Sequence, residues 1–219
     1  MPAPADFPIH TVMTTLQTAM QGYTLPMIDE LAATGASTPF RVLVATILSL
    51  RTKDTLTMVV APRLFAVADT PQAILSLDEE QLAQLIYPVG FYRTKARNLR
   101  QISTILLRDA LGVEAILLLA LPGVGRKTAN LVLTAGFGLP GICVDTHVHR
   151  ICNRWGYVQT KTPDDTELVL RQQLPAEYWL PINGLLVMLG QNICHPTSPR
   201  CSICPVAQWC ARNGVQRTR

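Results

Sequence analysis

The sequence predicts an all-α fold. Apolar residues recur at helical spacing along nearly the whole chain, and no stretch alternates between apolar and polar residues for long enough to indicate a β-strand. Helix starts are marked by capping residues, and about ten helices joined by short loops are expected. With 219 residues, 48% of them hydrophobic, the chain can bury a substantial core in one large domain or two small ones.

Local signals place several helices in order along the chain. Pro62 should break or kink the segment Asp54–Ala68, because proline has no N–H and clashes with the preceding turn. Thr70 and Thr162 each precede a proline, and Asp78 precedes two glutamates, all of which are typical of helix N-termini. A later helix is expected to begin at Lys127 and to end at two glycines, Gly136 and Gly138.

The net charge of +4 is compatible with a nucleic-acid partner. The basic residues gather in two places, at Arg93, Lys95, Arg97 and Arg100, and at Arg200, Arg212, Arg217 and Arg219. Such charges fit a solvated face and a DNA-facing surface equally well. No apolar run is long enough for a membrane span, and the N-terminus lacks the pattern of a secretory signal. We therefore expect an intracellular protein that does not bind a membrane.

Four of the six cysteines lie close together near the C-terminus, with the spacing C-x6-C-x2-C-x5-C: Cys194, Cys201, Cys204 and Cys210. Clustered thiolates usually hold a metal centre, and from the spacing alone they could bind zinc or an iron–sulfur cluster. The other two, Cys143 and Cys152, lie in apolar or helical contexts and are interpreted as buried hydrophobic residues.

A glycine hairpin, Leu-Pro-Gly-Val-Gly at positions 121–125, leads into a lysine. Gly123 and Gly125 lack a Cβ, so their backbone can take positive φ and approach another surface closely. Their amides, with those at the start of the next helix, could cradle a phosphate. The structural alternative is a tight turn between two helices, and Gly-x-Gly alone is weak evidence against it.

Two ionisable residues are candidates for catalysis. Lys127 begins an apolar helix, where a positive helix end and apolar surroundings should lower its proton affinity, as a lysine nucleophile requires. The commoner fate of a lysine is to extend into water. Asp145 precedes another helix, so it is either an N-cap or a carboxylate at the mouth of a pocket.

Three motifs together resemble the endonuclease III family, which comprises bifunctional DNA glycosylases and lyases of the helix-hairpin-helix superfamily. The motifs are LPGVGRKTAN at 121–130, VDTH at 144–147 and the four terminal cysteines, and the resemblance extends from about Pro39 to Cys210. It implies a six-helix barrel with the hairpin at 32–139. It also implies a second domain, built from 1–31 and 140–219, that holds a [4Fe–4S] cluster. The active site would lie between the domains.

The resemblance also implies DNA contacts, from the hairpin residues Leu121, Gly123, Val124 and Gly125. Phe91 takes the position of a wedge in the duplex, although it could simply pack in the core, and His147 would border the pocket. Arg51 stands where many members have a glutamine that fills the vacated base position, which affects the opposite-base preference. The segment Leu111–Glu114 before the hairpin is shorter than usual in the family.

The mechanism implied by the resemblance is covalent. Lys127 attacks C1′ of a flipped nucleotide, Asp145 stabilises positive charge on the sugar, and the Schiff base then breaks the strand by β-elimination. The expected partner is double-stranded DNA with oxidised pyrimidines or abasic sites, bound by a monomer. Adenine-removing relatives carry a glutamate where this chain has Thr46 and lack the lysine, and thymine- or uracil-mismatch relatives replace it with tyrosine. A non-catalytic iron–sulfur DNA-binding module is the alternative from another class.

Overall fold

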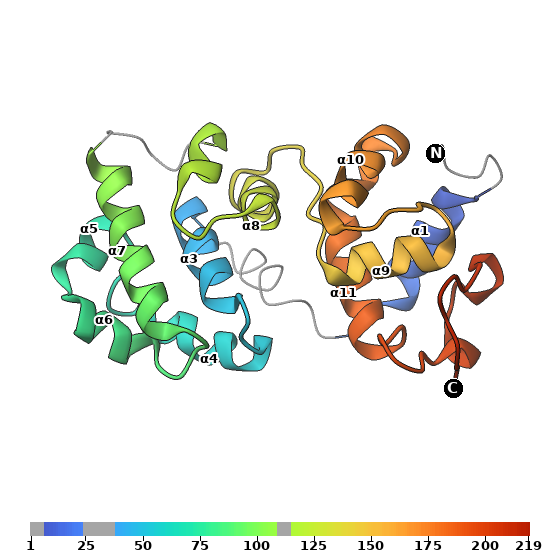
Figure 1. Ribbon diagram of the computed structural model, residues 1–219, viewed down its shortest axis with the longest axis horizontal. Helices are drawn as coiled ribbons and strands as arrows, with labels where there is room; N and C mark the ends of the chain where they lie inside the picture. The colour runs from blue at the N-terminus through green and yellow to red at the C-terminus, as the bar shows by residue number, and fades with distance from the viewer. Residues whose placement is uncertain (1–6, 24–37, 109–114) are drawn as a thin grey trace. The chain divides into compact units, whose positions relative to one another are not determined.

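The computed structural model describes residues 7–23, 38–108 and 115–219. Within these ranges the chain forms helices and no β-strand, which confirms the all-α prediction (Figure 1). Two compact units are present, one formed by Met1–Pro26 with Pro140–Arg219 and the other by Met27–Leu139. The boundary expected between residues 31 and 32, and the segment Leu111–Glu114, lie outside the described residues.

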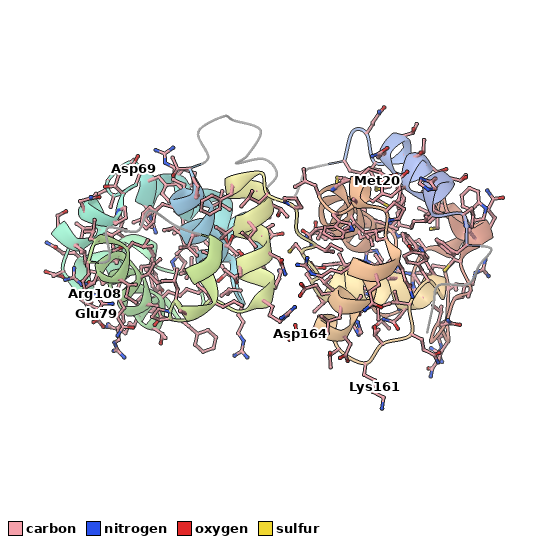
Figure 2. The ribbon with its side chains drawn as sticks, turned by 90° about the horizontal axis from the view of Figure 1, so that it is seen from above. Met20, Asp69, Glu79, Arg108, Lys161 and Asp164 are labelled. Carbon is pink, nitrogen blue, oxygen red and sulfur yellow. The ribbon has the colours of Figure 1, made fainter. Side chains whose placement is uncertain are left out.

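The unit Met27–Leu139 is built around the apolar helix α3, which contacts α4, α7, α8 and η2 (Figure 1). Asp69 lies at the surface of the unit (Figure 2). It pairs at 2.7 Å with Nη2 of Arg41, which lies in the first turn of α3. The elements of this unit, where η1 is a 3-10 helix and η2 a π-helix, are α3 (Pro39–Ser49), α4 (Asp54–Phe65), α5 (Pro71–Ser76), α6 (Glu79–Ile86), α7 (Tyr92–Arg108), η1 (Ala115–Ala120), α8 (Arg126–Leu131) and η2 (Val132–Gly136).

The predicted helix starts in this unit are confirmed by their caps. Thr70 Oγ1 accepts the N–H of Ala73 at 3.2 Å, and Asp78 forms a reciprocal capping box with Gln81. Of the break or kink expected at Pro62, the break does not occur, because α4 continues through this residue to Phe65. Pro62 lies in the last turn of α4, so the helix has only three residues left beyond it.

The other unit joins the N-terminal helix to the C-terminal half of the chain. Helix α1 packs on α11, and α9 contacts both α10 and α11. Cys143 and Cys152 are buried free thiols in this unit, as predicted. The elements, where η3 to η5 are 3-10 helices, are α1 (Ile9–Ala19), α9 (Thr146–Trp155), α10 (Pro163–Gln173), η3 (Ala176–Tyr178), α11 (Pro181–Asn192), η4 (Cys201–Ile203) and η5 (Ala207–Trp209).

Further boundaries agree with the local signals. Thr162 caps α10 by accepting the N–H of Asp165 at 3.1 Å. The helix expected from Lys127 begins one residue earlier, at Arg126, and continues through η2 to Gly136, and Gly138 follows with a φ of +64°. None of the helices in the described ranges is both long and apolar enough to cross a membrane.

Candidate functional site

The hairpin joins η1 to α8 through a tight turn. Leu121 and Val124 are buried, and the N–H of Val124 donates to the carbonyl of Leu121 at 3.1 Å. Gly123 has a φ of +77°, and a Cβ there would lie 2.7 Å from Nδ2 of Asn98. The fold itself therefore requires glycine at position 123. The side chains of Leu121 and Val124 belong to the core.

Gly125 differs from Gly123 in both conformation and surroundings. It is the N-cap of α8 with a φ of −95°, so of the two hairpin glycines only Gly123 uses a left-handed backbone. A Cβ at this position would meet no atom within 4 Å. Packing within the chain therefore gives no reason for glycine at position 125. The missing side chain leaves the N-terminus of α8 open to an approaching group.

Lys127 is the second residue of α8, and its side chain is exposed. Arg126 before it is exposed as well, whereas Thr128 and Ala129 after it are buried. The change from exposed to buried occurs within one turn of the helix. An amine at this position is accessible to a large substrate while its own helix is anchored in the core.

Asp145 is the N-cap of α9. Its Oδ1 accepts two main-chain hydrogen bonds, from the N–H of His147 at 2.8 Å and the N–H of Val148 at 2.9 Å. Asp145 therefore caps α9, which was one of the two roles predicted for it. Two bonds to one oxygen also fix the carboxylate in a single orientation. Lys127 and Asp145 belong to different units of the chain.

The ring of His147 is contacted at Nδ1 by an arginine of the same helix. Nη2 of Arg150 lies 3.1 Å from Nδ1 of His147 and donates to the carbonyl of Cys194 at 2.8 Å. Because a guanidinium can only donate, Nδ1 accepts and the ring proton is on Nε2. A Cβ at Gly190 of α11 would lie 2.1 Å from Nδ1. Glycine at position 190 therefore makes the space that the imidazole occupies.

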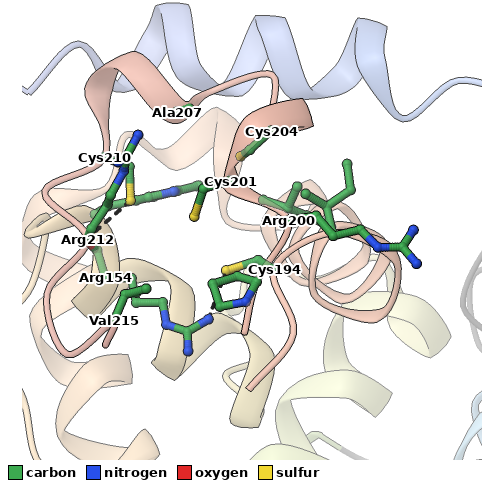
Figure 3. Close-up of a pocket in the computed structure, with 13 residues that line it drawn as sticks. Arg154, Cys194, Arg200, Cys201, Cys204, Ala207, Cys210, Arg212 and Val215 are labelled. Atoms are coloured by element: carbon green, nitrogen blue, oxygen red, sulfur yellow. Dashed lines mark hydrogen bonds between the residues drawn. The ribbon is translucent and has the colours of Figure 1, made fainter. Parts of the chain in front are cut away.

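The four terminal cysteines line one pocket in the unit that contains both chain ends (Figure 3). Cys194 follows the end of α11, Cys201 begins η4, Cys204 follows η4, and Cys210 follows η5. All four are free thiols and partly buried. Trp155, Leu189 and Ile193 contribute apolar surface to the same pocket.

Arg154 is a buried arginine at this pocket that sequence reasoning missed. Its Nη1 donates to Sγ of Cys194 at 3.2 Å and to the carbonyl of His195 at 2.7 Å, and Nη2 donates to the carbonyl of Pro196 at 2.7 Å. Its own carbonyl accepts from Sγ of Cys210 at 3.4 Å. The only sequence signal was its spacing of four residues from Arg150, which places both on one face of α9.

The donor set fits an iron–sulfur cluster. Burial raises the pKa of the Cys204 thiol to about 11 and also raises the pKa of the Cys210 thiol. These groups would stay neutral at physiological pH until a metal supplies positive charge, so metal binding is expected to release protons. Four thiols around one apolar pocket, with an arginine donating to one of the sulfurs, are the surroundings that such clusters use.

Arg51 and Phe91 lie side by side although they are forty positions apart in the sequence. The guanidinium carbon of Arg51 is 5.4 Å from the ring centroid of Phe91. Phe91 is 61% exposed, which excludes the alternative that it packs in the core. Both residues have left-handed backbones, with φ of +53° and +57°.

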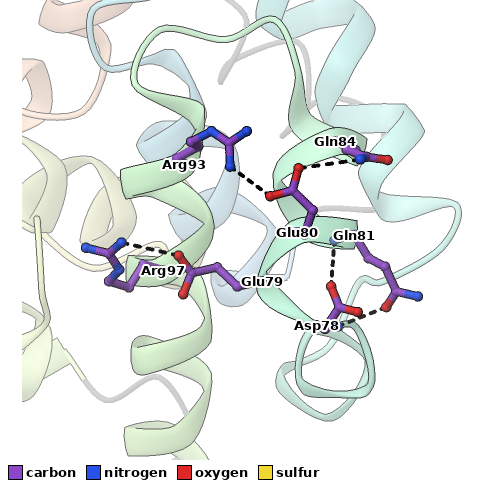
Figure 4. A network of polar contacts seen from close by, with 7 residues as sticks. All are labelled: Asp78, Glu79, Glu80, Gln81, Gln84, Arg93 and Arg97. Atoms are coloured by element: carbon purple, nitrogen blue, oxygen red, sulfur yellow. Dashed lines mark hydrogen bonds and ion pairs between the residues drawn. The ribbon is translucent and has the colours of Figure 1, made fainter.

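The basic residues of α7 are engaged within their own unit. Arg93 pairs with Glu80 at 2.8 Å, and Arg97 pairs with Glu79 at 3.3 Å (Figure 4). Arg100 donates to main-chain carbonyls near the end of α5. These contacts do not favour a DNA-facing stripe along α7. The four C-terminal arginines are exposed as well: Arg200, Arg212, Arg217 and Arg219.

Two family profiles match the sequence. The profile described as HhH-GPD superfamily base excision DNA repair protein matches residues 44–176, which include the hairpin, Lys127 and Asp145. The profile of the iron–sulfur binding domain of endonuclease III matches residues 194–210, which include all four terminal cysteines. The second match decides between zinc and an iron–sulfur cluster in favour of the latter.

Individual proteins agree with the profiles. The chain is 49% identical to endonuclease III of Thermotoga maritima over 175 residues, which cover 78% of this chain and 82% of that one. It is 45% identical to the chloroplastic endonuclease III homolog 2 of Arabidopsis thaliana, but the match spans only 47% of that longer protein. Among solved structures, a non-covalent endonuclease III–DNA complex matches with a TM-score of 0.81 at 31% identity, covering 93% of this chain and 94% of that one.

Proposed function

The chain belongs to the endonuclease III family, within the HhH-GPD superfamily of base excision DNA repair proteins, and on this premise we propose that it is a bifunctional DNA glycosylase and AP lyase. As a family member it is a DNA glycosylase with a [4Fe–4S] cluster. The proposed substrates are oxidised or ring-saturated pyrimidines in double-stranded DNA, and abasic sites, acted on by a monomer. The observation that carries the proposal is the exposed Lys127 at the start of α8, directly after the hairpin.

In the proposed reaction the neutral amine of Lys127 attacks C1′ of a nucleotide flipped out of the duplex. The new C–N bond forms as the bond from C1′ to the base breaks, and the base leaves with the electron pair and takes up a proton. The sugar ring then opens to a protonated imine. Loss of a proton from C2′ expels the 3′ phosphate, and water later releases the lysine from the cleaved strand.

The proposed role of Asp145 is electrostatic. Its carboxylate stabilises the positive charge that develops on the sugar as the base departs, and it accepts the proton that Lys127 loses. The two main-chain bonds to Oδ1 support this role, because a carboxylate that is already oriented needs no reorganisation during the reaction.

The direct test uses duplexes that each carry one defined lesion. A bifunctional enzyme nicks the damaged strand and is trapped on abasic DNA by borohydride, which reduces the imine to a stable amine. A monofunctional glycosylase would release the base without nicking or trapping. A non-catalytic module would bind without either reaction.

We expect Gly125→Ala to weaken DNA binding about tenfold while changing the free energy of unfolding by less than about 1 kcal/mol. The φ of −95° and the open space around position 125 accept a methyl group, whereas a phosphate against the amides of this turn does not. Fluorescence anisotropy with an abasic-analogue duplex, together with thermal melting, checks both values.

The matched control for this experiment is Gly123→Ala. It should instead lower stability, because the strained φ and the contact with Asn98 belong to the fold. Affinity of the Gly125→Ala protein equal to that of wild type would contradict a phosphate contact at this turn.

We also propose that Arg51 and Phe91 enter the duplex around the flipped nucleotide, and that His147 borders the base pocket. The exposure of Phe91 and its contact with Arg51 support the first role. The contact of Arg150 with Nδ1 of His147, which orients the ring, supports the second.

The proposed ligands of the cluster are Cys194, Cys201, Cys204 and Cys210. The purified protein should be brown and hold about four irons per chain, and Cys204→Ser should lose the cluster. Because these cysteines join η4 and η5 to the end of α11, protease should then cut the C-terminal segment before the barrel. Iron analysis, visible absorbance and limited proteolysis measure these outcomes.

Cys143→Ala, which removes a buried thiol outside the pocket, is the control and should retain its iron. Stoichiometric zinc in wild-type protein prepared without oxygen would defeat the assignment.

A further inference from the structure

Lys95 of α7 is buried although it carries a charge. Only 6% of it is exposed, and burial lowers the pKa of its ammonium to about 8. Nζ donates to the carbonyls of Leu48 at 2.8 Å and Leu50 at 2.7 Å, and to Oγ1 of Thr52 at 3.1 Å. An ammonium has three protons and a neutral amine only two, so all three bonds require the charged form.

The three acceptors lie at the C-terminal end of α3 and in the loop that follows. Carbonyls at this end of a helix lack intrahelical partners and carry the negative end of the helix dipole, so a buried ammonium is stabilised there. Leu50 and Thr52 are the two neighbours of Arg51. Lys95 therefore contacts both neighbours of Arg51, through the main-chain carbonyl of Leu50 and the side-chain hydroxyl of Thr52.

A second set of contacts ties this loop to the turn before α7. The N–H of Gly90 donates to Oγ1 of Thr52 at 3.1 Å, and a Cβ on Gly90 would lie 2.6 Å from the carbonyl oxygen of Arg51. The carbonyl of Phe91 accepts the main-chain N–H of Lys95 at 3.0 Å. Oγ1 of Thr52 thus accepts hydrogen bonds from both Lys95 and Gly90, and these bonds connect the two loops.

The two connected loops present Arg51 and Phe91 to solvent. Left-handed backbones are costly in residues other than glycine, and they persist where surrounding contacts enforce them. Here two such residues are adjacent, and their side chains meet in a cation–π contact. An apolar ring and a cation held out from the surface in this way are arranged in advance for a partner.

We propose that Lys95 is a positioning residue that holds Arg51 and Phe91 in the geometry needed for insertion into damaged duplex DNA. The inference rests on the proposed function, since it takes the inserted side chains from there. A methionine or leucine would fill the same volume without a charge. Only the ammonium can bond the three oxygen atoms at the end of α3 and in the loop after it. These bonds connect the Arg51 loop to α7, which follows Phe91 directly.

The test measures insertion directly, with duplexes that carry a tetrahydrofuran abasic analogue opposite 2-aminopurine. Wild-type protein should raise the 2-aminopurine fluorescence, because inserted side chains unstack the orphaned base. At saturating protein, Lys95→Met should lose most of this rise. Its ratio of nicking rates on abasic sites opposite different bases should also change about tenfold, in the same direction as in Arg51→Ala.

Two further variants separate positioning from a general loss of structure. The double variant Arg51→Ala, Lys95→Met should show no larger change in this ratio than Arg51→Ala alone, because both act through one side chain. Thr52→Val keeps the shape of the threonine and removes the shared hydroxyl. It should change the fluorescence and the ratio of nicking rates in the same direction as Lys95→Met, but by a smaller amount. Arg97→Met removes a charge from the exposed face of the same helix and should behave like wild type.

Each outcome is decisive. Wild-type fluorescence and opposite-base ratios in both Lys95→Met and Thr52→Val would overturn the role of Lys95, and so would a loss of activity that is equal on all opposite bases. Failure of the wild-type protein to be trapped on abasic DNA would overturn the proposed lyase instead. The fluorescence measurement does not depend on strand cleavage, so it still tests the positioning role of Lys95 in that case.

Discussion

Lys127→Gln should form no borohydride-trapped adduct on abasic DNA and should lose nicking activity by at least about 10³-fold. Glutamine keeps much of the length of lysine but has no nucleophilic amine, so no imine can form. DNA binding should remain largely intact, since in the proposed complex the hairpin amides and the basic surface make most of the phosphate contacts. Gel analysis of trapped complexes and of strand cleavage, at protein concentrations that saturate the duplex, measures the loss.

The neighbouring Arg126 offers a matched control, because it is also exposed in the first turn of α8. Arg126→Gln removes the same charge from the same helix end and should still be trapped. Undiminished trapping by the Lys127→Gln protein would move the nucleophile to another residue.

Asp145→Asn should cut base excision severely, on the order of 10²-fold or more, but leave part of the lyase activity on a preformed abasic site. The two steps differ because no glycosidic bond remains to be broken in the second substrate. Asparagine caps helices about as well as aspartate, so its oxygen can keep the bonds to the N–H groups of His147 and Val148. The rates of base release and of abasic nicking, measured on matched duplexes, give the comparison.

The cap provides an internal control for Asp145. Asp145→Ala removes both the charge and the cap, and it should lower the free energy of unfolding by about 1 kcal/mol where Asp145→Asn does not. Equal losses of excision in both variants, with stability lost only in the alanine variant, would assign the effect to the charge. Full excision activity in Asp145→Asn would leave this aspartate with a structural role alone.

Features that depend on neighbours in the sequence were predictable. Thr70, Asp78 and Thr162 begin helices as expected, because each cap bonds to an N–H group only three residues ahead. Pro62 does not break α4, because the helix is already near its end there and the missing N–H affects only the last turn. The basic residues of α7 could not be assigned from sequence, since their partners Glu79 and Glu80 lie on another helix.

The sequence by itself therefore determined the helical class, the family and its iron–sulfur cofactor, because these depend on periodicity and on short contiguous motifs. Only the tertiary structure revealed that Arg154 donates to Sγ of Cys194, that Gly190 makes room for His147, and that Lys95 joins the loops of Arg51 and Phe91. These contacts link residues about forty positions apart. Such pairs meet only after the helices have packed, and no local pattern in the chain records which side chains will then face each other.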